Sequence, residues 1–298
     1  MALDKQPFFT IVIPTYNRAG LIAKTIESVL AQTFTGYEVI IVDDGSTDNT
    51  TEVVQPYVSE QIQYFKKENA ERAVARNFGT KKARGQYVNW LDSDDLLLPD
   101  HLQVIYDFLQ KHNLPDAIHT AYRHEDDKGN IIAVKDDFPE QVSRQLLKEN
   151  YFSCNNIIVK TSTALQNLFN EDRELSASED YNLWLRLAAQ KPVWCCNTVT
   201  TIVVSHENRS IFTMRNRDML IKRFEKFINY TVADPLVQKA FSSRFGYFKM
   251  RNYMLLAQSL ANYSFKKKAL GYLWKAFVNS PGIIFQKSFY SVLKKLVF

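Results

Sequence analysis

The chain has 298 residues, of which 46% are hydrophobic and 23% are charged. This composition is ordinary for a globular protein and excludes a globally disordered chain. The net charge of +5 is unevenly divided, because residues 211–298 carry 16 Lys and Arg against 3 acidic residues, and the remaining 21 basic and 29 acidic residues precede them. We therefore expect a body with a net charge of −8 in residues 1–210 and a basic region with +13 in residues 211–298.

The N-terminal residues lack the basic region and the long apolar core of a signal peptide. No stretch approaches the roughly 18 consecutive apolar residues of a membrane span. Cys154, Cys195 and Cys196 form neither a disulfide framework nor a spacing typical of metal ligands. These features predict a cytoplasmic protein with buried free thiols.

The first 111 residues alternate between buried apolar runs and amphipathic segments. We expect strands at residues 8–13, 37–42, 62–65 and 86–91, and helices at residues 21–32, 49–57, 70–83 and 99–111. Asn49 and Glu52 are spaced as a capping box for the second helix, and Pro99 is expected at the first position of the fourth. Strand–helix alternation of this kind predicts an α/β fold with a mainly parallel sheet and helices on both faces.

Three carboxylates, Asp92, Asp94 and Asp95, follow the strand expected at residues 86–91. Like charges this close repel, and a cation would neutralise them. Alternate residues of an extended chain point the same way, so Asp92 and Asp94 could reach one ion together. The alternative is a solvated acidic turn that leads into the helix at Pro99.

Beyond residue 111 we expect strands at residues 116–122 and 131–134, joined by a turn at residues 127–130. Residues 136–156 are polar and irregular. Four titratable residues could be taken for a metal cluster, but we expect them to be solvated hairpin residues: His119, His124, Glu125 and Asp126. A β-branched strand is expected at residues 198–205.

Four loop motifs occur in a fixed order, namely residues 11–17 (IVIPTYN), 42–48 (VDDGSTD), 75–77 (ARN) and 92–95 (DSDD). A fifth motif, residues 178–186 (SEDYNLWLR), follows. In order and spacing they resemble the inverting family 2 glycosyltransferases of the GT-A fold, over about residues 8–209. The resemblance implies a Rossmann-like nucleotide-binding domain in residues 1–210, with residues 211–298 as a basic helical extension.

The resemblance implies a donor site at the first three loops. Three residues would shape the wall of the nucleotide-base pocket: Pro14, Thr15 and Tyr16. Asp44 would accept a hydrogen bond from uracil or thymine, although a turn carboxylate that caps the next helix is the alternative. Arg76 would meet the diphosphate or the base, with Arg72 as an alternative, and Asn77 would tie the loop.

The same resemblance implies a divalent ion at the acidic loop. Asp92 corresponds to the acid near the ribose and the metal, and Asp94 to the direct ligand of Mn²⁺ or Mg²⁺. Such an ion stabilises the negative charge of a leaving nucleoside diphosphate. His206 could also ligate the ion, and Arg209 could contact the diphosphate; for His206 a polar loop residue is the alternative.

The fifth motif begins a predicted helix, so Glu179 and Asp180 lie in its first turn. Ser176 and Glu179 have the spacing of a capping box, which indicates a structural role for Glu179. By resemblance, Asp180 is the general base that removes the proton from the acceptor hydroxyl. Attack from the face opposite the diphosphate would then invert the anomeric carbon.

The processive members of the family carry a Gln-x-x-Arg-Trp motif and several membrane spans, and this sequence has neither. The resemblance therefore implies transfer of one sugar from a UDP- or dTDP-sugar to a glycan or lipid-linked acceptor, as in bacterial cell-surface polysaccharide biosynthesis. Alternatives are a nucleotide-sugar-binding protein without turnover and a basic scaffold at the membrane. A nucleotidyltransferase would need a Gly-rich phosphate loop that is missing.

The C-terminal region is predicted to be helical, at about residues 211–231 and 236–263 and in two shorter segments. The shorter segments present apolar faces beside lysine clusters: Leu270, Trp274 and Phe277 in one, Phe289, Leu293 and Leu296 in the other. Such helices suit an anionic membrane surface and would place the protein on the inner face of the cell membrane. The alternative is a helical bundle on the catalytic body. No nucleic-acid motif accompanies the charge, so nucleic acid is not expected as a partner.

Overall fold

The computed structural model describes residues 6–205 and 217–297. Within these ranges the chain divides into two compact units. The first contains residues 6–142, 151–173 and 191–205, and the second contains residues 143–150, 174–190 and 217–297. The second unit therefore includes two segments from the first 210 residues in addition to the basic C-terminal region.

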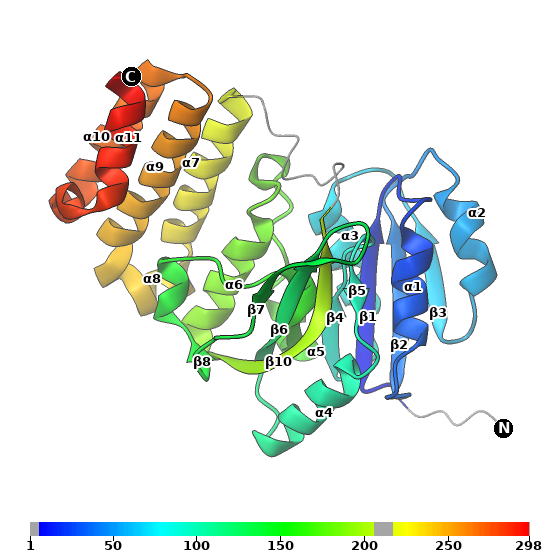
Figure 1. Ribbon diagram of the computed structural model, residues 1–298. Coiled ribbons are helices and arrows are strands. Elements are labelled where there is room, and N and C mark those ends of the chain that lie inside the picture. Colours follow the sequence, from blue (N-terminus) through cyan, green and yellow to red (C-terminus); the bar gives the residue numbers. More distant parts are fainter. Residues whose placement is uncertain (1–5, 206–216, 298) are drawn as a thin grey trace. The chain divides into compact units, whose positions relative to one another are not determined.

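A single sheet forms the centre of the first unit and has ten strands over the described residues (Figure 1). The strands are β1 Phe9–Thr15, β2 Tyr37–Asp43, β3 Ile62–Lys66, β4 Tyr87–Trp90, β5 Leu96–Leu97, β6 Ala117–Glu125, β7 Ile131–Lys135, β8 Gln141–Val142, β9 Ile157–Lys160 and β10 Val193–Val204. Their order is β3-β2-β1-β4-β9-β6-β10-β5, with β7 paired to β6 and β8 to β10. The first four strands of this order are parallel, whereas β9 is antiparallel to both β4 and β6. The expected α/β fold with a mixed, mainly parallel sheet is confirmed.

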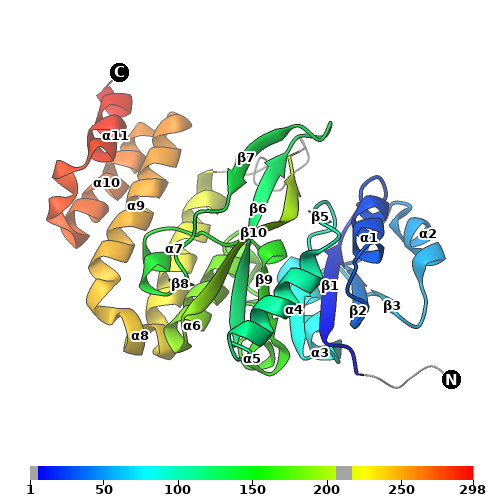
Figure 2. The same ribbon diagram turned by 60° about the horizontal axis from the view of Figure 1, so that its bottom comes forward.

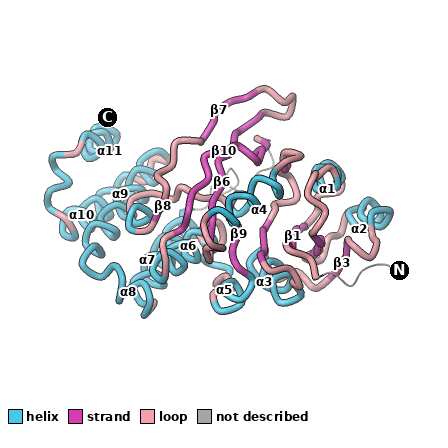
Figure 3. Tube along the Cα trace, turned by 90° about the horizontal axis from the view of Figure 1, so that it is seen from below, coloured by secondary structure: helices cyan, strands magenta, loops and turns pink. Residues whose placement is uncertain are grey.

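Helices cover both faces of the parallel half of the sheet. They are α1 Ile22–Leu30, α2 Thr50–Val54, α3 Arg72–Lys82, α4 His101–Lys111 and α5 Thr161–Gln166. The side chains of Ile11 and Ile13 pack with α1 and α4 on one face. Those of Ile40 and Val42 pack against Ala75 of α3 on the other. Figures 2 and 3 show β1 between α1 on one side and α3 on the other.

Helix α3 approaches β1 closely at Gly79. A Cβ atom at this position would lie 2.3 Å from Cγ1 of Val12, far inside van der Waals contact. Glycine therefore lets the helix pack directly on the strand. The N-terminal end of α3 is thereby fixed beside the ends of β1 and β2, where the candidate site lies.

Most element boundaries of the first 135 residues follow the sequence prediction within two residues, but several details differ. The Asn49 side chain makes no capping hydrogen bond, and the backbone N–H of Thr50 donates instead to Asp48 Oδ1 at 3.0 Å. Pro99 lies two residues before α4, whose N-cap is Asp100. The short strands β5, β8 and β9 and helix α5 were not predicted. The three cysteines are buried free thiols, as expected.

A buried polar network fixes β4, the strand that leads into the acidic loop. Nδ1 of His101 lies 2.8 Å from Thr200 Oγ1, and its Nε2 lies 3.3 Å from Asn89 Oδ1. The Asn89 amide donates to the carbonyls of Asn155 and Ile157 at 3.1 Å each. Burial lowers the pKa of His101 to about 3, so the ring is neutral and this network carries no buried charge.

The second unit is helical, with α6 Glu179–Gln190, α7 Arg217–Ala233, α8 Pro235–Phe241, α9 Phe245–Asn262, α10 Lys266–Asn279 and α11 Lys287–Val297, and a 3₁₀ turn, η2, at Arg144–Leu147. Helix α9 packs against α7, α10 and α11, as Figure 1 illustrates. Buried apolar side chains such as Leu256, Leu273 and Val292 form its core. The helix expected at residues 236–263 is divided in two at about residue 243. Within the described ranges, no helix is long and apolar enough to cross a membrane.

Candidate active site

The carboxyl ends of β1, β2 and β4 meet at one edge of the sheet. In the parallel register, Thr15 pairs with Asp43 and Val12 pairs with Trp90. Pro14 and Thr15 end β1, and the loops after these strands carry Tyr16, Asp44 and Asp92. Ligands of open α/β sheets bind beyond this edge, so the fold brings these residues to a typical binding position.

Side chain–backbone hydrogen bonds tie the loops after β1 and β2 together. Asn17, with a φ of 51°, accepts at Oδ1 from the backbone N–H of Thr47 at 2.8 Å, and its own N–H donates to Ser46 Oγ at 2.9 Å. The backbone N–H of Arg18 donates to Thr50 Oγ1 at 3.0 Å. Because each loop supplies partners to the other, the two loops form one preorganised wall.

The end of β1 presents a buried hydroxyl and an exposed ring side by side in sequence. Pro14 and Thr15 are buried, whereas Tyr16 is 46% exposed. No described group lies within hydrogen-bond distance of Thr15 Oγ1. A buried hydroxyl without a partner costs about 1–3 kcal/mol, so this atom is suited to accept or donate a hydrogen bond to a ligand.

Asp44 organises the segment that enters α3. Its carboxylate accepts from the backbone N–H groups of Ala70 at 3.0 Å and Glu71 at 2.8 Å, and it forms an ion pair with Lys67. Glu71 has a φ of 80°, unusual for a residue with a side chain. The carboxylate therefore binds the start of α3, and not the next helix in sequence as the alternative reading supposed. A carboxylate has about four acceptor positions, so a further hydrogen bond to a base is compatible with this arrangement.

Arginines accompany both predicted metal-proximal acids. Nη2 of Arg76 donates to Asp92 Oδ1 at 2.7 Å, and the guanidinium lies 5.3 Å from the ring centroid of Phe169. Arg76 is only 2% exposed, so the structure places it against Asp92 and its expected contact with a diphosphate or base is not tested. Nε of Arg18 lies 3.6 Å from Asp94 Oδ2. Arg18 was not singled out from the sequence, although its position directly after the first loop motif could have signalled it.

Asn77, predicted to tie the donor loop, is bonded to the segment at Phe169 and Glu171. Its amide donates to the carbonyl of Phe169 at 2.9 Å and to Glu171 at 2.8 Å, and its Oδ1 accepts from the backbone N–H of Phe169 at 2.9 Å. These bonds hold the Phe169 ring in place, and that ring in turn contacts Arg76. Asn77 therefore supports the acidic loop indirectly, through Phe169 and then Arg76.

The donor set at the acidic loop fits a hard divalent cation. The Asp92 and Asp94 side chains are 31% and 11% exposed, and each supplies oxygen ligands. Among the described residues, no group of three or more His, Cys, Asp or Glu side chains is placed to hold one metal ion. Mg²⁺ is commonly bound by one or two carboxylates together with substrate phosphates, so two protein ligands are sufficient.

Asp95, the third acid of the loop, is structural. It is fully buried, with Oδ2 accepting from the amide of Asn155 at 2.5 Å and Oδ1 accepting from the backbone N–H of Val204 at 2.8 Å. It thereby joins the acidic loop to the last residue of β10. His206, predicted as a metal ligand, and Arg209, predicted to contact the diphosphate, lie outside the described residues.

Asp180 lies in the second unit, in the first turn of α6. The helix begins at Glu179, two residues after Ala177, which has a φ of 66°. Ser176 is therefore too far from the helix to cap it, and the predicted capping box with Glu179 is wrong. The guanidinium of Arg223, on α7, interacts with both Glu179 and Asp180, and these carboxylates oppose a burial effect that lowers the Arg223 pKa. Sequence analysis missed Arg223, which only helix packing brings to this place.

The expectation of solvated hairpin residues is wrong for His119 and for Glu125, which is 8% exposed and pairs with Arg123 at 2.6 Å. His119 is fully buried on β6, with its ring stacked on Phe152 at 4.4 Å, and burial lowers its pKa to about 3. Asp126 is a turn residue, as expected, and accepts from the backbone N–H groups of Lys128 and Asn130 at 3.0 and 2.8 Å. As noted above, the structure assembles no metal cluster here from its described residues.

Structural comparison assigns the fold. S. aureus TarS, residues 1–349 in complex with UDP-GlcNAc, superposes with a TM-score of 0.64 at 18% identity, covering 86% of this chain and 80% of that one. The mannosyltransferase PcManGT from Pyrobaculum calidifontis, in complex with GDP-Man and Mn²⁺, gives a TM-score of 0.55 at 17% identity, covering 99% and 86%. The protein thus has the GT-A fold of glycosyltransferases.

Sequence comparison assigns the family. The model of glycosyl transferase family 2 matches residues 10–165. An uncharacterized glycosyltransferase of Rickettsia typhi is 31% identical over 220 residues, which are 71% of this chain and 68% of the relative. Chondroitin synthase of Escherichia coli is 33% identical over 214 residues, which are 70% of this chain but 31% of that protein. The chain belongs to glycosyl transferase family 2, and it spans about a third of the length of an uncharacterized glycosyltransferase of Rickettsia felis that is 33% identical.

Proposed function

We propose that this protein is a metal-dependent, inverting glycosyltransferase that moves one sugar from a UDP- or dTDP-sugar to an acceptor hydroxyl. The observation that carries the proposal is the sheet edge of the first unit. Two carboxylates, Asp92 and Asp94, follow β4 there, and the partnerless hydroxyl of Thr15 ends β1. Membership of family 2 and the nucleotide-sugar complexes of TarS and PcManGT support the same function.

The donor side of the reaction is assigned to the first unit. Tyr16 would stack on the base, while Thr15 and Asp44 would hydrogen-bond to it. Asp92 and Asp94 would hold Mn²⁺ or Mg²⁺, which when bound would stabilise the charge of the departing diphosphate. Arg76 would keep Asp92 in position, and His206 and Arg209 remain proposed contacts of the ion and the diphosphate.

The acceptor side depends on Asp180. We assign it the role of general base, which takes the proton of the acceptor hydroxyl as that oxygen attacks the anomeric carbon. The guanidinium of Arg223 places a positive charge beside this carboxylate.

The acceptor is proposed to be a glycan or a lipid-linked glycan of a bacterial surface polysaccharide. The names of two relatives, chondroitin synthase of Escherichia coli and hyaluronan synthase of Pasteurella multocida, indicate polysaccharide synthesis and support this class. Such an acceptor would be met at the cytoplasmic face of the membrane.

Helix α10 supports a peripheral membrane position. Its one face is buried in the helical core through Ala269, Leu273 and Ala276. The other face leaves Leu270 56% and Trp274 64% exposed, with a lysine cluster at the start of the helix. Phe277 and the whole second predicted face, Phe289, Leu293 and Leu296, pack against the helical core instead. The proposed membrane face is therefore limited to Leu270 and Trp274 of α10, beside its lysines.

The donor half is tested by calorimetric titration of the full chain with UDP, dTDP, GDP and CMP, each with and without Mn²⁺. We expect UDP or dTDP to bind with Mn²⁺ and to bind much more weakly without it. Replacement of Asp94 by Asn should remove the dependence on metal, whereas Asp107→Asn, an exposed position on α4, should not. If no nucleotide binds in the presence of Mn²⁺, the chain belongs to the family by ancestry but lacks the proposed activity.

A further inference from the structure

A pocket in the second unit lies apart in sequence from all the donor-site motifs. It has a volume of about 660 Å³, and it is lined by Ser143, Arg144, Gln145, Leu147, Lys148, Arg244 and Tyr247. All seven residues belong to the second unit. Ligand pockets commonly enclose about 300–1,000 Å³, so this volume is enough for a small polar group with an attached sugar or polyol.

The lining is strongly basic. Arg144, Lys148 and Arg244 are exposed and supply three positive charges, and none of the seven described lining residues is acidic. No ion pair joins these three cations to a described carboxylate, unlike Arg186, which pairs with Asp234 at 3.3 Å in the same unit. Three cations gathered without a counter-charge repel one another, and a multiply charged anion would relieve that repulsion.

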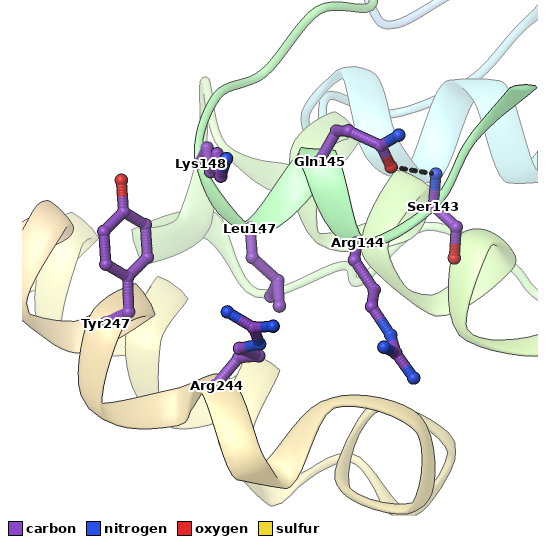
Figure 4. A pocket seen from close by; sticks show the side chains of 7 residues that line it. All are labelled: Ser143, Arg144, Gln145, Leu147, Lys148, Arg244 and Tyr247. Carbon is purple, nitrogen blue, oxygen red and sulfur yellow. Dashed lines mark hydrogen bonds between the residues drawn. The ribbon is translucent and has the colours of Figure 1, made fainter.

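The pocket also has apolar surface that suits a carbon skeleton. Figure 4 shows the Leu147 side chain pointing toward Arg244, with Arg144 on the side of Leu147 away from Tyr247. Leu147 is buried, and Tyr247 is half-buried, so a hydrophobic floor and an aromatic ring accompany the charges. Oε1 of Gln145 accepts from the backbone N–H of Ser143 at 3.1 Å, which fixes the entry to the turn.

The turn that carries Arg144 is anchored on the helix that carries Asp180. The hydroxyl of Tyr181 donates to the carbonyl of Leu146, and Ser143 Oγ donates to the carbonyl of Ala188 at 2.9 Å. Tyr181 is the residue directly after Asp180, and its ring stacks on Phe227 at 4.9 Å between centroids. The pocket and the proposed base are therefore parts of one packed assembly.

We propose that this pocket binds a phosphate group of the acceptor, so that the acceptor is a phosphate-bearing glycan or polyol. The inference rests on the proposed function, because it takes Asp180 as the residue that receives the acceptor. Arginine binds phosphate through paired N–H donors, and two arginines with a lysine match the charge of a phosphate better than that of a single carboxylate. A concave pocket with an aromatic wall favours a sugar phosphate over the flat surface of a bilayer.

The test is calorimetric titration of the full chain with inorganic pyrophosphate, without nucleotide or divalent metal. We expect Arg144→Gln and Arg244→Gln each to weaken binding by about tenfold, as loss of a charge-assisted hydrogen bond predicts. Lys239→Gln, an exposed change of the same charge on α8, should leave binding unchanged. Equal binding by wild type and both arginine variants would overturn the proposal.

A second arm separates the acceptor from a lipid headgroup. Flotation with phosphatidylglycerol vesicles should give the same result for wild type and for the two arginine variants. If vesicle binding requires the arginines and pyrophosphate binding does not, the pocket holds lipid and the proposal is wrong. Titration of the same proteins with UDP and Mn²⁺ keeps the two hypotheses distinct. If the wild type does not bind UDP with Mn²⁺, the proposed function is wrong, whereas the pyrophosphate titration tests the pocket independently.

Discussion

The two units hold their polar side chains in place by different means. In the first unit the candidate donor site is built from loops at strand ends, and neighbouring loops bind one another through backbone N–H groups, as Asn17 binds Thr47. In the second unit the polar groups come from separate helices, as when Arg223 of α7 interacts with Asp180 of α6. The first arrangement joins loops that follow neighbouring strands, and the second joins residues of separate helices.

This difference has a consequence for robustness. A side chain–backbone hydrogen bond has a net value of about 1 kcal/mol, and several such bonds share the work of fixing each loop. In the second unit Asp180 accepts from the backbone N–H of Tyr181 at 2.6 Å and also interacts with Arg223. Because the proposed base is a single group, we expect its substitution to change catalysis strongly, while nucleotide binding by the first unit persists.

The largest effect is expected for Asp180→Asn. An amide cannot take the proton of the acceptor, and general base catalysis typically contributes about 10²- to 10⁴-fold. We expect the transfer rate to fall by a factor in that range, with the affinity for UDP and Mn²⁺ nearly unchanged. Initial rates of sugar transfer and calorimetric titration of the same preparation measure the two quantities.

Glu174→Gln provides the matched control. Glu174 lies in the same unit and pairs on the surface with Lys222 at 3.2 Å and Lys226 at 3.1 Å, so its loss should leave transfer unchanged. Asp180→Asn that still turns over would remove Asp180 from its assigned role. Loss of nucleotide affinity as well would contradict the division of labour between the units.

A smaller effect is expected for Arg223→Met, which removes the cation beside Asp180 and Glu179. Without it the charged form of Asp180 is less favoured, so the acid limb of the rate profile should move to higher pH. At neutral pH we expect transfer to change little, with an unchanged KM for the donor. The measurement is the pH dependence of kcat, with Lys222→Met, on an exposed neighbour in α7, as the control. An unshifted profile would show that Arg223 has only a structural role.

The site residues of the first unit could be predicted from the sequence better than those of the second, for a physical reason. A strand end and the loop after it are contiguous in sequence, so the motifs around Asp44 and Asp92 could be read directly. The hydrogen-bond partners of those residues could not be read from the sequence, because they lie far away along the chain. Asp94 and Asp95 are adjacent and chemically identical, yet Asp95 is buried by Asn155 and Val204, which are 60 and 109 residues away.

The basic pocket and Arg223 were invisible for the same reason. Arg144 and Arg244 line one pocket although 100 residues separate them, and no local pattern links them. His119 had the sequence context of a hairpin, but the register of β6 buries it among aromatic rings. Helical periodicity did predict the apolar faces of the C-terminal helices, and it left open whether those faces are covered.

The smallest expected effect concerns the exposed face of α10. If this face enters the interface of an anionic bilayer, Leu270→Ser and Trp274→Ser each remove apolar surface that would leave water on binding. Partial burial of such side chains predicts a loss of affinity for phosphatidylglycerol vesicles of roughly three- to tenfold. Vesicle flotation measures it, and titration with UDP and Mn²⁺ should be unaffected.

Leu236→Ser is the matched control, because Leu236 is 41% exposed on α8 and lies outside the exposed face of α10. The core side of α10 stays intact in all three variants, since Leu270, Trp274 and Leu236 do not belong to the buried cluster around Leu273. Equal vesicle binding by all of them would mean that α10 serves the helical core alone. A selective loss at Leu270 and Trp274 would instead mean that one helix has two functions, with its buried face stabilising the second unit and its exposed face binding the membrane.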